Sequence, residues 1–246
     1  MSLPVFHLSG LADARVDGSV ELTGDEARHA VVVRRIRVGE QVALTDGAGT
    51  TVVGTVSGTT KTSLTATVNE VVESPPESPR LVVVQAIPKG DRGELAVEML
   101  TEVGVDVIVP WAASRSVAVW RGERAAKSLA KWRSTAREAA KQSRRAWFPS
   151  VAEMAQTSDV VDLLREAALA AVLHEAGERP LATLDVPGEG DVVLVVGPEG
   201  GISDDELAAF AEVGAEPVRM GRAVLRTSTA GVAAAAALLS RTRRWG

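Results

Sequence analysis

Two loops in the second half of the chain hold residue types that could bind a ligand, and the first is Gly197-Pro198-Glu199-Gly200-Gly201-Ile202-Ser203. It directly follows the apolar run 192–196, which predicts a buried strand. Glycines let a backbone approach a partner closely, and the amides at a helix start can receive the polar atoms of a ligand. Ser203 and Glu206 fit an S-x-x-E capping box, which predicts the start of the next helix. A tight strand-to-helix turn explains this loop as well as a binding site does.

The second loop is 219–231, with the sequence RMGRAVLRTSTAG. Its early part, MG, ends a short predicted strand, and its later part leads into an Ala-rich predicted helix. Thr227 or Ser228 can cap that helix, so capping alone accounts for the hydroxyls. Arg226 is not needed for capping, which makes it the stronger candidate for chemistry.

A third loop, 173–175, follows the apolar segment LAAVL and contains His174, a residue that alone is more often structural than catalytic. The chain lacks the Lys-Ser/Thr that follows the glycines of a P-loop, and it lacks the G-x-G-x-x-G dinucleotide fingerprint. These missing motifs disfavour a dinucleotide-dependent oxidoreductase.

Positive charge is concentrated in one segment, although the net charge of the whole chain is −5. Residues 115–145 contain ten Lys or Arg against two Glu. Taking 100° per residue along the long helix over 123–143 and the two residues that follow it, one half holds Lys127, Lys131, Arg133, Arg137, Lys141, Arg144 and Arg145. The other half holds Ala125, Leu129, Trp132, Ala136 and Ala139. This separation predicts a basic face that binds anions and, on the opposite side of the helix, an apolar face that is buried. A face that is only solvated is the open alternative.

Alternating strands and helices are needed to position the three loops. The apolar runs LVVVQAI (81–87), VDVIVPW (105–111), LAAVLHE (169–175) and VVLVVG (192–197) predict buried strands. The segment GELAVEMLTEVG (93–104) has helical periodicity, and Gly104 is its expected C-cap. Helices are also predicted over 123–143, over 203–213 and in the final Ala-rich segment. This order predicts a mostly parallel sheet wrapped by helices, with ligands bound at the carboxyl ends of its strands.

The first part of the chain has a different pattern. Residues 40–72 alternate apolar and polar side chains, and Asp46-Gly47 is a hairpin signal. Closely spaced short strands predict a small barrel of the OB or PUA kind. The Pro- and Ser-rich stretch ESPPESPR (73–80) separates the two patterns. We therefore expect an N-terminal β-barrel domain over 1–73, a linker over 74–80 and an α/β domain over 81–246.

Composition limits the class of protein. The chain has no cysteine, and its three histidines lie far apart in the sequence, so no metal site is expected. No apolar run reaches the length of a membrane span, and the N-terminus has no signal-peptide pattern. We expect a cytoplasmic protein with no membrane partner.

The three loops together resemble those of the RsmE family of SPOUT methyltransferases, which methylate N3 of a uridine in 16S ribosomal RNA. The similar segments are GPEGGIS (197–203), MGRAVLRTSTA (220–230), EAAKQSRRAWFP (138–149), VEMLTEVGVDVIVPWAASRS (97–116) and RHAVVVRRIRVGE (28–40). Ser228 stands where the family more usually has Glu. The resemblance implies a SPOUT-type sheet that ends in a trefoil knot, a PUA-like N-terminal domain, S-adenosylmethionine (SAM) as cofactor, a homodimer, and 16S rRNA or the small ribosomal subunit as partner.

Carried over to this sequence, the resemblance places the SAM site in the three loops. The expected cofactor-binding residues are Leu173, His174, Glu175, Val196, Gly197, Pro198, Glu199, Gly200, Gly201, Met220, Gly221, Val224, Leu225 and Arg226. Leu225 and Ile202 would pack on the adenine faces.

Methyl transfer to N3 requires loss of the ring proton, and the charge that spreads onto O2 and O4 suits an arginine. Arg144, Arg226 and Arg115 are the expected catalytic residues that stabilise this negative charge. Glu138 is the expected base that takes the N3 proton, with Glu199 or water as alternatives. RNA-binding residues are expected at His29, Arg34, Arg35, Arg37, Lys89 and Arg92. For Arg34 and Arg37, solvation of a barrel edge is the open alternative. The rival functions are a SPOUT methyltransferase that modifies another RNA atom, such as a ribose 2′-oxygen, and a non-catalytic RNA-binding protein.

Overall fold

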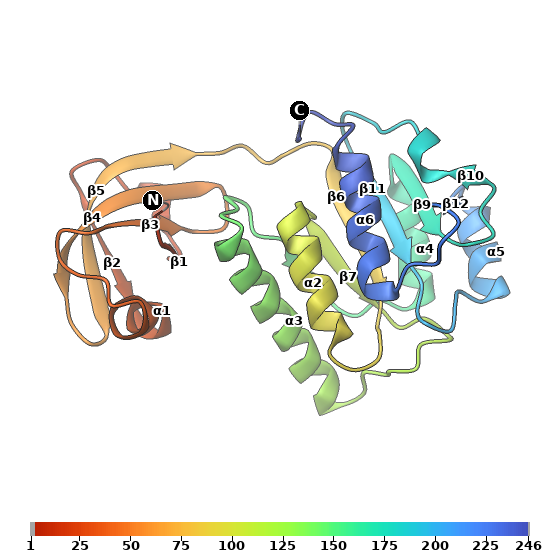
Figure 1. Ribbon diagram of the computed structural model, residues 1–246, viewed down its shortest axis with the longest axis horizontal. Helices are drawn as coiled ribbons and strands as arrows, with labels where there is room; N and C mark the ends of the chain where they lie inside the picture. The colour runs from red at the N-terminus through yellow and green to blue at the C-terminus, as the bar shows by residue number, and fades with distance from the viewer. Residues whose placement is uncertain (1–2, 246) are drawn as a thin grey trace. The chain divides into compact units, whose positions relative to one another are not determined.

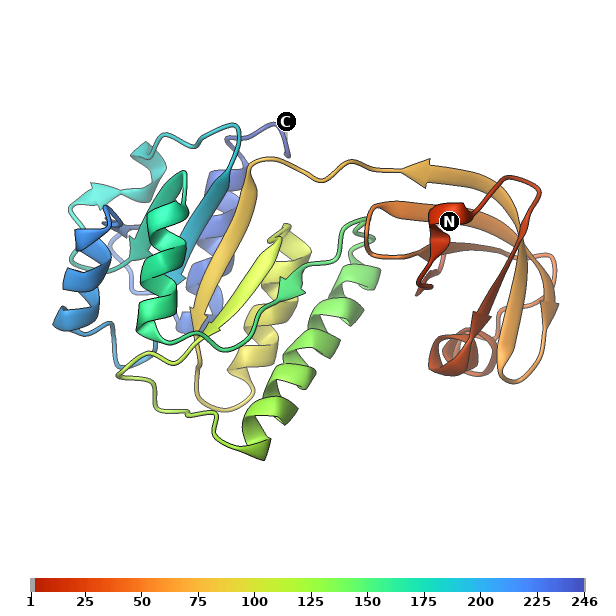
Figure 2. The same ribbon diagram turned by 180° about the vertical axis from the view of Figure 1, so that it is seen from behind.

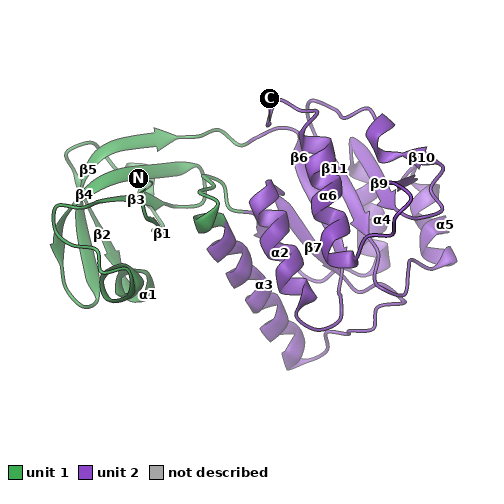
Figure 3. Ribbon diagram, viewed as in Figure 1, with its two compact units in different colours: residues 1–76, 140–148 green, residues 77–139, 149–246 purple. Residues whose placement is uncertain are grey.

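The structure is a computed structural model that describes residues 3–245. The chain forms two compact units, which Figure 3 distinguishes by colour. Unit 1 comprises residues 1–76 and 140–148, and unit 2 comprises residues 77–139 and 149–246. Segment 140–148, which the sequence patterns place in the second domain, therefore packs with unit 1.

Unit 1 is built on a five-stranded, strongly curled sheet that forms a half-barrel (Figure 1). Its elements are β1 (Val5–His7), β2 (Ser19–Thr23), α1 (Gly24–Arg28), β3 (Gln41–Thr45), β4 (Thr50–Thr59) and β5 (Ser63–Glu73), with a short 3₁₀ turn (Leu11–Asp13) and a π-helical turn (His29–Val33). The strand order is β1-β3-β4-β5-β2, and only β1 and β3 pair in parallel. The predicted small barrel is confirmed.

Turn chemistry and bulges shape this sheet. The predicted hairpin at Asp46-Gly47 joins β3 to β4, and the Asp46 carboxylate accepts the amides of Ala48 and Thr50 at 2.8 and 3.0 Å. Two register shifts interrupt the pairing of β4 with β5, and such bulges increase the local twist. The alternating side chains of β4 and β5 then close over one apolar core that includes Leu44, Val56 and Leu64.

Unit 2 contains a seven-stranded sheet in which every described pair is parallel. Its strands are β6 (Arg80–Ala86), β7 (Val107–Trp111), β8 (Ser150–Val151), β9 (Leu169–Leu173), β10 (Arg179–Pro180), β11 (Asp191–Val196) and β12 (Glu216–Arg219), in the order β10-β12-β9-β11-β6-β7-β8. The central strands β6 and β11 are apolar almost throughout because helices cover both of their faces. The predicted α/β class with a mostly parallel sheet is confirmed.

Helices cover both faces of the sheet in unit 2 (Figures 1 and 2). The helices are α2 (Arg92–Val103), α3 (Glu123–Gln142), α4 (Thr157–Glu166), α5 (Asp204–Glu212) and α6 (Thr227–Leu239), with a 3₁₀ turn at Leu181–Thr183. One core contains side chains of α2, α3 and α6, such as Leu100, Trp132 and Leu238, and the other contains Leu164 of α4 and Phe210 of α5. Helix α6 is therefore a core helix.

The predicted basic helix is α3. Its predicted apolar face is confirmed, because Leu129, Trp132 and Ala136 are buried. Part of its positive charge is neutralised, since Lys131 pairs with Glu94 at 3.0 Å. The sequence prediction is wrong for Lys141, which it places on the solvated basic face. Only 7% of the Lys141 side chain is exposed, and it pairs with Glu26 at 2.5 Å.

Several elements were not predicted from the sequence. These are α4, the short strands β8 and β10, and the helical turns of unit 1. The strands and helical turns are too short for pattern alone to reveal them. Helix α4 does have a helical apolar spacing, at Val160, Val161, Leu163 and Leu164, which the sequence interpretation overlooked. Among the described residues, no helix is both long enough and apolar enough to cross a membrane.

Candidate functional site

A large cleft lies at the carboxyl ends of the parallel strands in unit 2. Its walls come from the segments that follow β6, β7, β9, β11 and β12. Helix α2 follows β6 on one face of the sheet, whereas α5 follows the adjacent strand β11 on the other face. Such a switch between neighbouring strands opens a crevice in which α/β proteins bind ligands.

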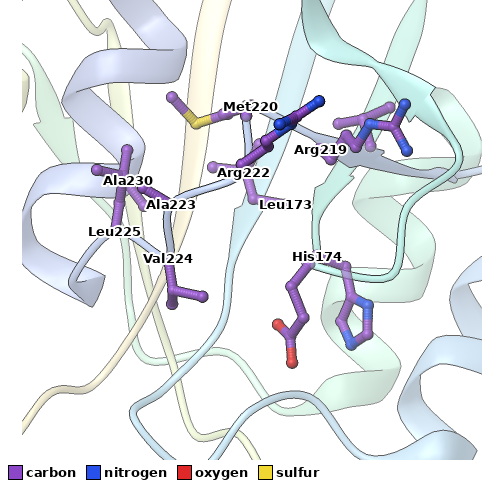
Figure 4. Close-up of a pocket in the computed structure, with 12 residues that line it drawn as sticks. Leu173, His174, Arg219, Met220, Arg222, Ala223, Val224, Leu225 and Ala230 are labelled. Atoms are coloured by element: carbon purple, nitrogen blue, oxygen red, sulfur yellow. The ribbon is translucent and has the colours of Figure 1, made fainter.

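The cleft has two continuous parts, with volumes of about 620 and 910 Å³. Both parts share His174 from the segment after β9 and Val224 and Leu225 from the loop before α6. Figure 4 shows Val224 and Leu225 on one side of the first part and His174 on the other. These volumes fall within the range of about 300–1,000 Å³ that is typical of small-molecule and cofactor sites.

Close backbone packing explains the glycines of loop 197–201. A Cβ atom at Gly200 would lie 2.7 Å from the carbonyl oxygen of Arg115, so only glycine fits against that neighbouring loop. Gly201 has φ +75°, a left-handed conformation that side chains rarely adopt. The Glu199 carboxylate accepts the amide of Lys89 at 3.2 Å. Glu199 therefore ties this loop to the segment after β6.

A hydroxyl group links two of the predicted loops. Thr227, at the start of α6, donates its hydroxyl to the carbonyl oxygen of Gly197 at 3.1 Å. The sequence interpretation of Thr227 or Ser228 as the cap of α6 is wrong, because the N-cap is Arg226 and no side chain caps it. The carbonyl of Arg226 accepts the amides of Thr229 and Ala230 instead.

Glu206 connects the predicted capping box to the loop after β7. The box is confirmed, since the Ser203 hydroxyl accepts the amide of Glu206 and the Glu206 carboxylate accepts the amide of Ser203. The same carboxylate accepts the amide and hydroxyl of Ser114 at 2.8 and 2.9 Å and the hydroxyl of Thr157 at 3.2 Å. Burial by itself raises the pKa of Glu206, but the hydrogen bonds from Ser114 and Ser203 outweigh it and hold the pKa below its ordinary value.

Arg115 is the next residue after this anchored serine. Its guanidinium donates to the carbonyl oxygen of Ile202 at 3.3 Å, and its side chain lines the cleft. Ile202 itself is 3% exposed and belongs to the core. Leu225 is 41% exposed, so of the two expected adenine contacts it offers the larger apolar surface.

The structure brings together all fourteen expected cofactor-binding residues, since each lines one or both parts of the cleft. Two of the expected catalytic residues, Arg115 and Arg226, line the same cleft, as do the expected RNA-binding residues Lys89 and Arg92. Glu138 lies on α3 and is not among the residues that line it. The roles of these residues stay predictions.

The remaining expected residues belong to unit 1. Arg144 lines a separate small pocket there together with His29 and Arg34. Arg35 and Arg37 lie just beyond this pocket in sequence and are not among the residues that line it. The sequence did not predict the grouping of Arg144 with the N-terminal cations, because it depends on the packing of segment 140–148 in unit 1.

Two further arginines of the cleft belong to the predicted loop 219–225 but are not among the expected site residues. Arg219 and Arg222 line its first part beside Met220 (Figure 4). The available signal was the repeated arginine in RMGRAVLR, where one loop places three cations within eight residues. With Arg115 and Arg226, they make the cleft cationic and suited to anionic partners.

Comparisons with known families agree with this architecture. Residues 76–239 match the family described as RNA methyltransferase domain, and residues 22–69 match the RNA methyltransferase PUA domain. The ribosomal RNA small subunit methyltransferase E of Mycobacterium bovis (strain ATCC BAA-935 / AF2122/97) is 43% identical over 245 residues, which cover 98% of this chain and 93% of that protein. The protein of the same name from Bacillus subtilis (strain 168) is 26% identical and covers 90% of each chain.

Solved structures give the same result. A methyltransferase from Legionella pneumophila, in complex with SAM, is similar with a TM-score of 0.87 and 28% identity, over 98% of this chain and 99% of that one. The ribosomal RNA small subunit methyltransferase E of Neisseria gonorrhoeae, bound to S-adenosyl methionine, has a TM-score of 0.86 and 28% identity over 98% of each chain. With its sheet, its PUA-like unit and its near-complete match to these relatives, this chain belongs to the ribosomal RNA small subunit methyltransferase E family of RNA methyltransferases.

Proposed function

We propose that this protein transfers the methyl group of SAM to N3 of a uridine in 16S ribosomal RNA. The observation that carries the proposal is the convergence of all three predicted loops on one cationic cleft, in a chain that matches its relatives over nearly its whole length. Two similar solved structures contain SAM, which supports the choice of cofactor.

The lining of the cleft fits SAM in size and in chemistry. Backbone groups of 197–201 and 219–225 can hydrogen-bond the adenine edge and the ribose without intruding side chains, and Leu225 supplies an apolar contact. Nothing lies within 4 Å of a Cβ placed on Gly221, so this loop leaves room beside its backbone. Bound there, SAM supplies an electrophilic methyl group.

The reaction at N3 needs the negative charge of the deprotonated ring to be balanced. This charge spreads onto O2 and O4, and a guanidinium aimed at those oxygens stabilises it. Arg115 and Arg226 are our candidates because both line the cleft. Arg144, which the sequence also predicts for this role, lines a pocket in unit 1 and is not one of our candidates.

The reaction also needs a group that accepts the N3 proton. Glu199 lines the cleft, but its carboxylate already accepts the amide of Lys89. Glu138 lies outside the lining. We therefore favour Glu199 or water over Glu138 as the group that takes the N3 proton. The N3 atom lies on the Watson–Crick edge, so the target base must be unpaired or flipped out.

Homodimer formation and the trefoil knot belong to the proposal as well. The loops around the cleft expose large apolar side chains, with Val117 63%, Val119 56% and Val224 81% exposed, and a second copy of the chain would cover them. The meeting of the loops after β9, β11 and β12 at the start of α6 supports the expected knot. A substrate in the small ribosomal subunit would place the protein in the cytoplasm.

The test is to identify the methylated atom. The protein is incubated with 16S rRNA and isotopically labelled SAM, and the nucleosides are separated by chromatography against N3-methyluridine and 2′-O-methyluridine standards. The proposal predicts label in N3-methyluridine alone. Label in a ribose-methylated nucleoside would support the rival SPOUT activity, and no label in any nucleoside would support a non-catalytic RNA-binding protein.

A further inference from the structure

Unit 1 contains a small pocket with strongly positive walls. Three chain segments form it: residues 3–6 at the N-terminus, the π-helical turn with the residue that follows it, and the end of α3. The lining includes His29, Arg34, Lys141 and Arg144, and no Asp or Glu is among the described residues that line it. The pocket is separate from the cleft in unit 2, because the two share no lining residue.

An acidic neighbour pairs with one of the basic side chains that line the pocket. Glu26 pairs with Lys141 at 2.5 Å and also accepts the amide of His7 at 3.2 Å. This pair holds the Lys141 side chain in place, with 7% of it exposed. Arg34 is exposed, and the Arg144 guanidinium makes one long hydrogen bond, to the carbonyl oxygen of Leu3 at 3.4 Å. The pocket therefore keeps positive charge that can act on a ligand.

The backbone at two of these residues is unusual. Arg144 has φ 57°, in the position after α3 where the amides of Arg144 and Arg145 bond back to Lys141 and Ala140. Glycine is the usual residue there, because a left-handed conformation is strained for a residue that has a Cβ atom. His29 begins a π-helical turn, a rare element that is frequent at functional sites. Arg144 brings a guanidinium and His29 an imidazole ring to the same pocket. Strained backbone is found more often at ligand sites than elsewhere.

The size of the pocket restricts the ligand. Its volume of about 160 Å³ lies below the range of about 300–1,000 Å³ for drug-sized ligands. Together with a planar arginine fork that suits phosphate oxygens, this volume favours a single phosphate group over a whole nucleotide.

We propose that this pocket binds one phosphate group of the RNA backbone, through Arg34 and Arg144 with His29 beside them. That the phosphate group belongs to RNA rests on the proposed function. That the pocket binds a phosphate group rests on its residues and size alone. Such a contact fixes the position of the RNA on the protein and carries no sequence information.

The test uses variants that keep the fold. Arg144→Gly removes the side chain and also relieves the left-handed strain, so its melting temperature should equal or exceed that of the wild type. Arg34→Ala removes the second cation, and Arg15→Ala, on an exposed residue of unit 1 outside the pocket, is the matched control. Affinities for 16S rRNA and for a 20-nucleotide oligouridylate are measured between 50 and 200 mM salt.

We expect each pocket variant to bind both RNAs about tenfold more weakly, as one lost charged hydrogen bond predicts. The slope of log K against log[salt] should fall by about 0.7–0.9 for the lost phosphate contact, while Arg15→Ala keeps the wild-type slope. Unchanged affinity and slope in both pocket variants overturn the proposal.

Two further readouts separate the rival explanations. If calorimetry shows inorganic phosphate bound to the wild type and lost in Arg144→Gly while RNA affinity is unchanged, the pocket is a free-phosphate site and the RNA contact is overturned. If Arg144→Gly lowers kcat at saturating RNA without changing RNA affinity, Arg144 acts in catalysis and the proposal is again overturned. A wild type that shows the expected salt slopes but transfers no methyl group contradicts the proposed function and not the pocket.

Discussion

Glu206 and Ser114 are 92 residues apart in the sequence, yet the Glu206 carboxylate accepts both the amide and the hydroxyl of Ser114. The helix cap of α5 therefore also anchors the loop that carries Arg115. Since Gly200 packs against the carbonyl of Arg115, one carboxylate holds together two walls of the cleft. This arrangement makes the geometry of the cleft depend on a residue that does not line it.

Glu206→Gln should destabilise the chain by about 2 kcal/mol at pH 7, as expected for hydrogen bonds to a charged group. Each carboxylate oxygen accepts a backbone amide, so the NH₂ group of glutamine must face one of these donors. Denaturant unfolding gives the free energy, and Glu212→Gln, on the exposed side of the same helix, is the control. An equal effect of both substitutions would contradict the anchoring role.

The same substitution has a defined pH dependence. The pKa of Glu206 is lowered in the folded chain, whereas the ordinary value in an unfolded chain is about 4.3. Its stabilising contribution is therefore fully present above the unfolded pKa and is lost as the pH falls through the folded pKa. The difference in unfolding free energy between wild type and Glu206→Gln should shrink on acidification below about pH 4. A difference that stays constant down to pH 3 would show that the charge of Glu206 is not what stabilises the loop.

Gly200→Val should abolish SAM binding in calorimetry. Any Cβ at this position lies 2.7 Å from a backbone oxygen, so loop 197–201 must move away from the segment after β7. Gly188→Val is the matched control, because nothing lies within 4 Å of its Cβ and Gly188 does not line the cleft. Wild-type affinity in Gly200→Val would remove this loop from the SAM site.

Thr227→Val should lower SAM affinity about fivefold and stability by about 1 kcal/mol. The substitution keeps the shape of the side chain but leaves the carbonyl of Gly197 without its hydroxyl donor. Thr227→Ser keeps the hydroxyl and should restore both quantities. If serine and valine behave alike, the link between the two loops does not depend on this hydrogen bond.

Arg226→Ala should lower kcat for methyl transfer by about 100-fold, the usual cost of losing one donor to developing charge. SAM binds chiefly through backbone groups in this account, so its dissociation constant should change by less than about threefold. Arg165→Ala, which removes an exposed charge from α4, is the control. A parallel loss of SAM affinity and kcat would assign Arg226 to cofactor binding instead of charge stabilisation.

The sequence predicts the strands and the loops of unit 2 well because their signals are local. Continuous apolar runs mark β6 and β11, and Ser203 with Glu206 marks the start of α5. Loops that follow parallel strands must meet at one edge of the sheet, so the cleft follows from the order of the elements.

Contacts between distant segments could not be predicted in this way. Lys141 fits the solvated face of a helix by its spacing, and its burial depends on Glu26, 115 residues earlier. The position of Thr227 in the sequence predicts a helix cap, and the bond of its hydroxyl to Gly197 exists only because the two loops meet. Arg144 occupies a position where glycine is usual, and the sequence has no signal for its left-handed backbone.

The central claim is most directly tested by mass spectrometry of 16S rRNA from cells that lack this protein. The account predicts that one N3-methyluridine disappears and returns when the wild-type gene is restored, but not when Gly200→Val is supplied. A full complement of N3-methyluridine in the deletion strain would contradict it.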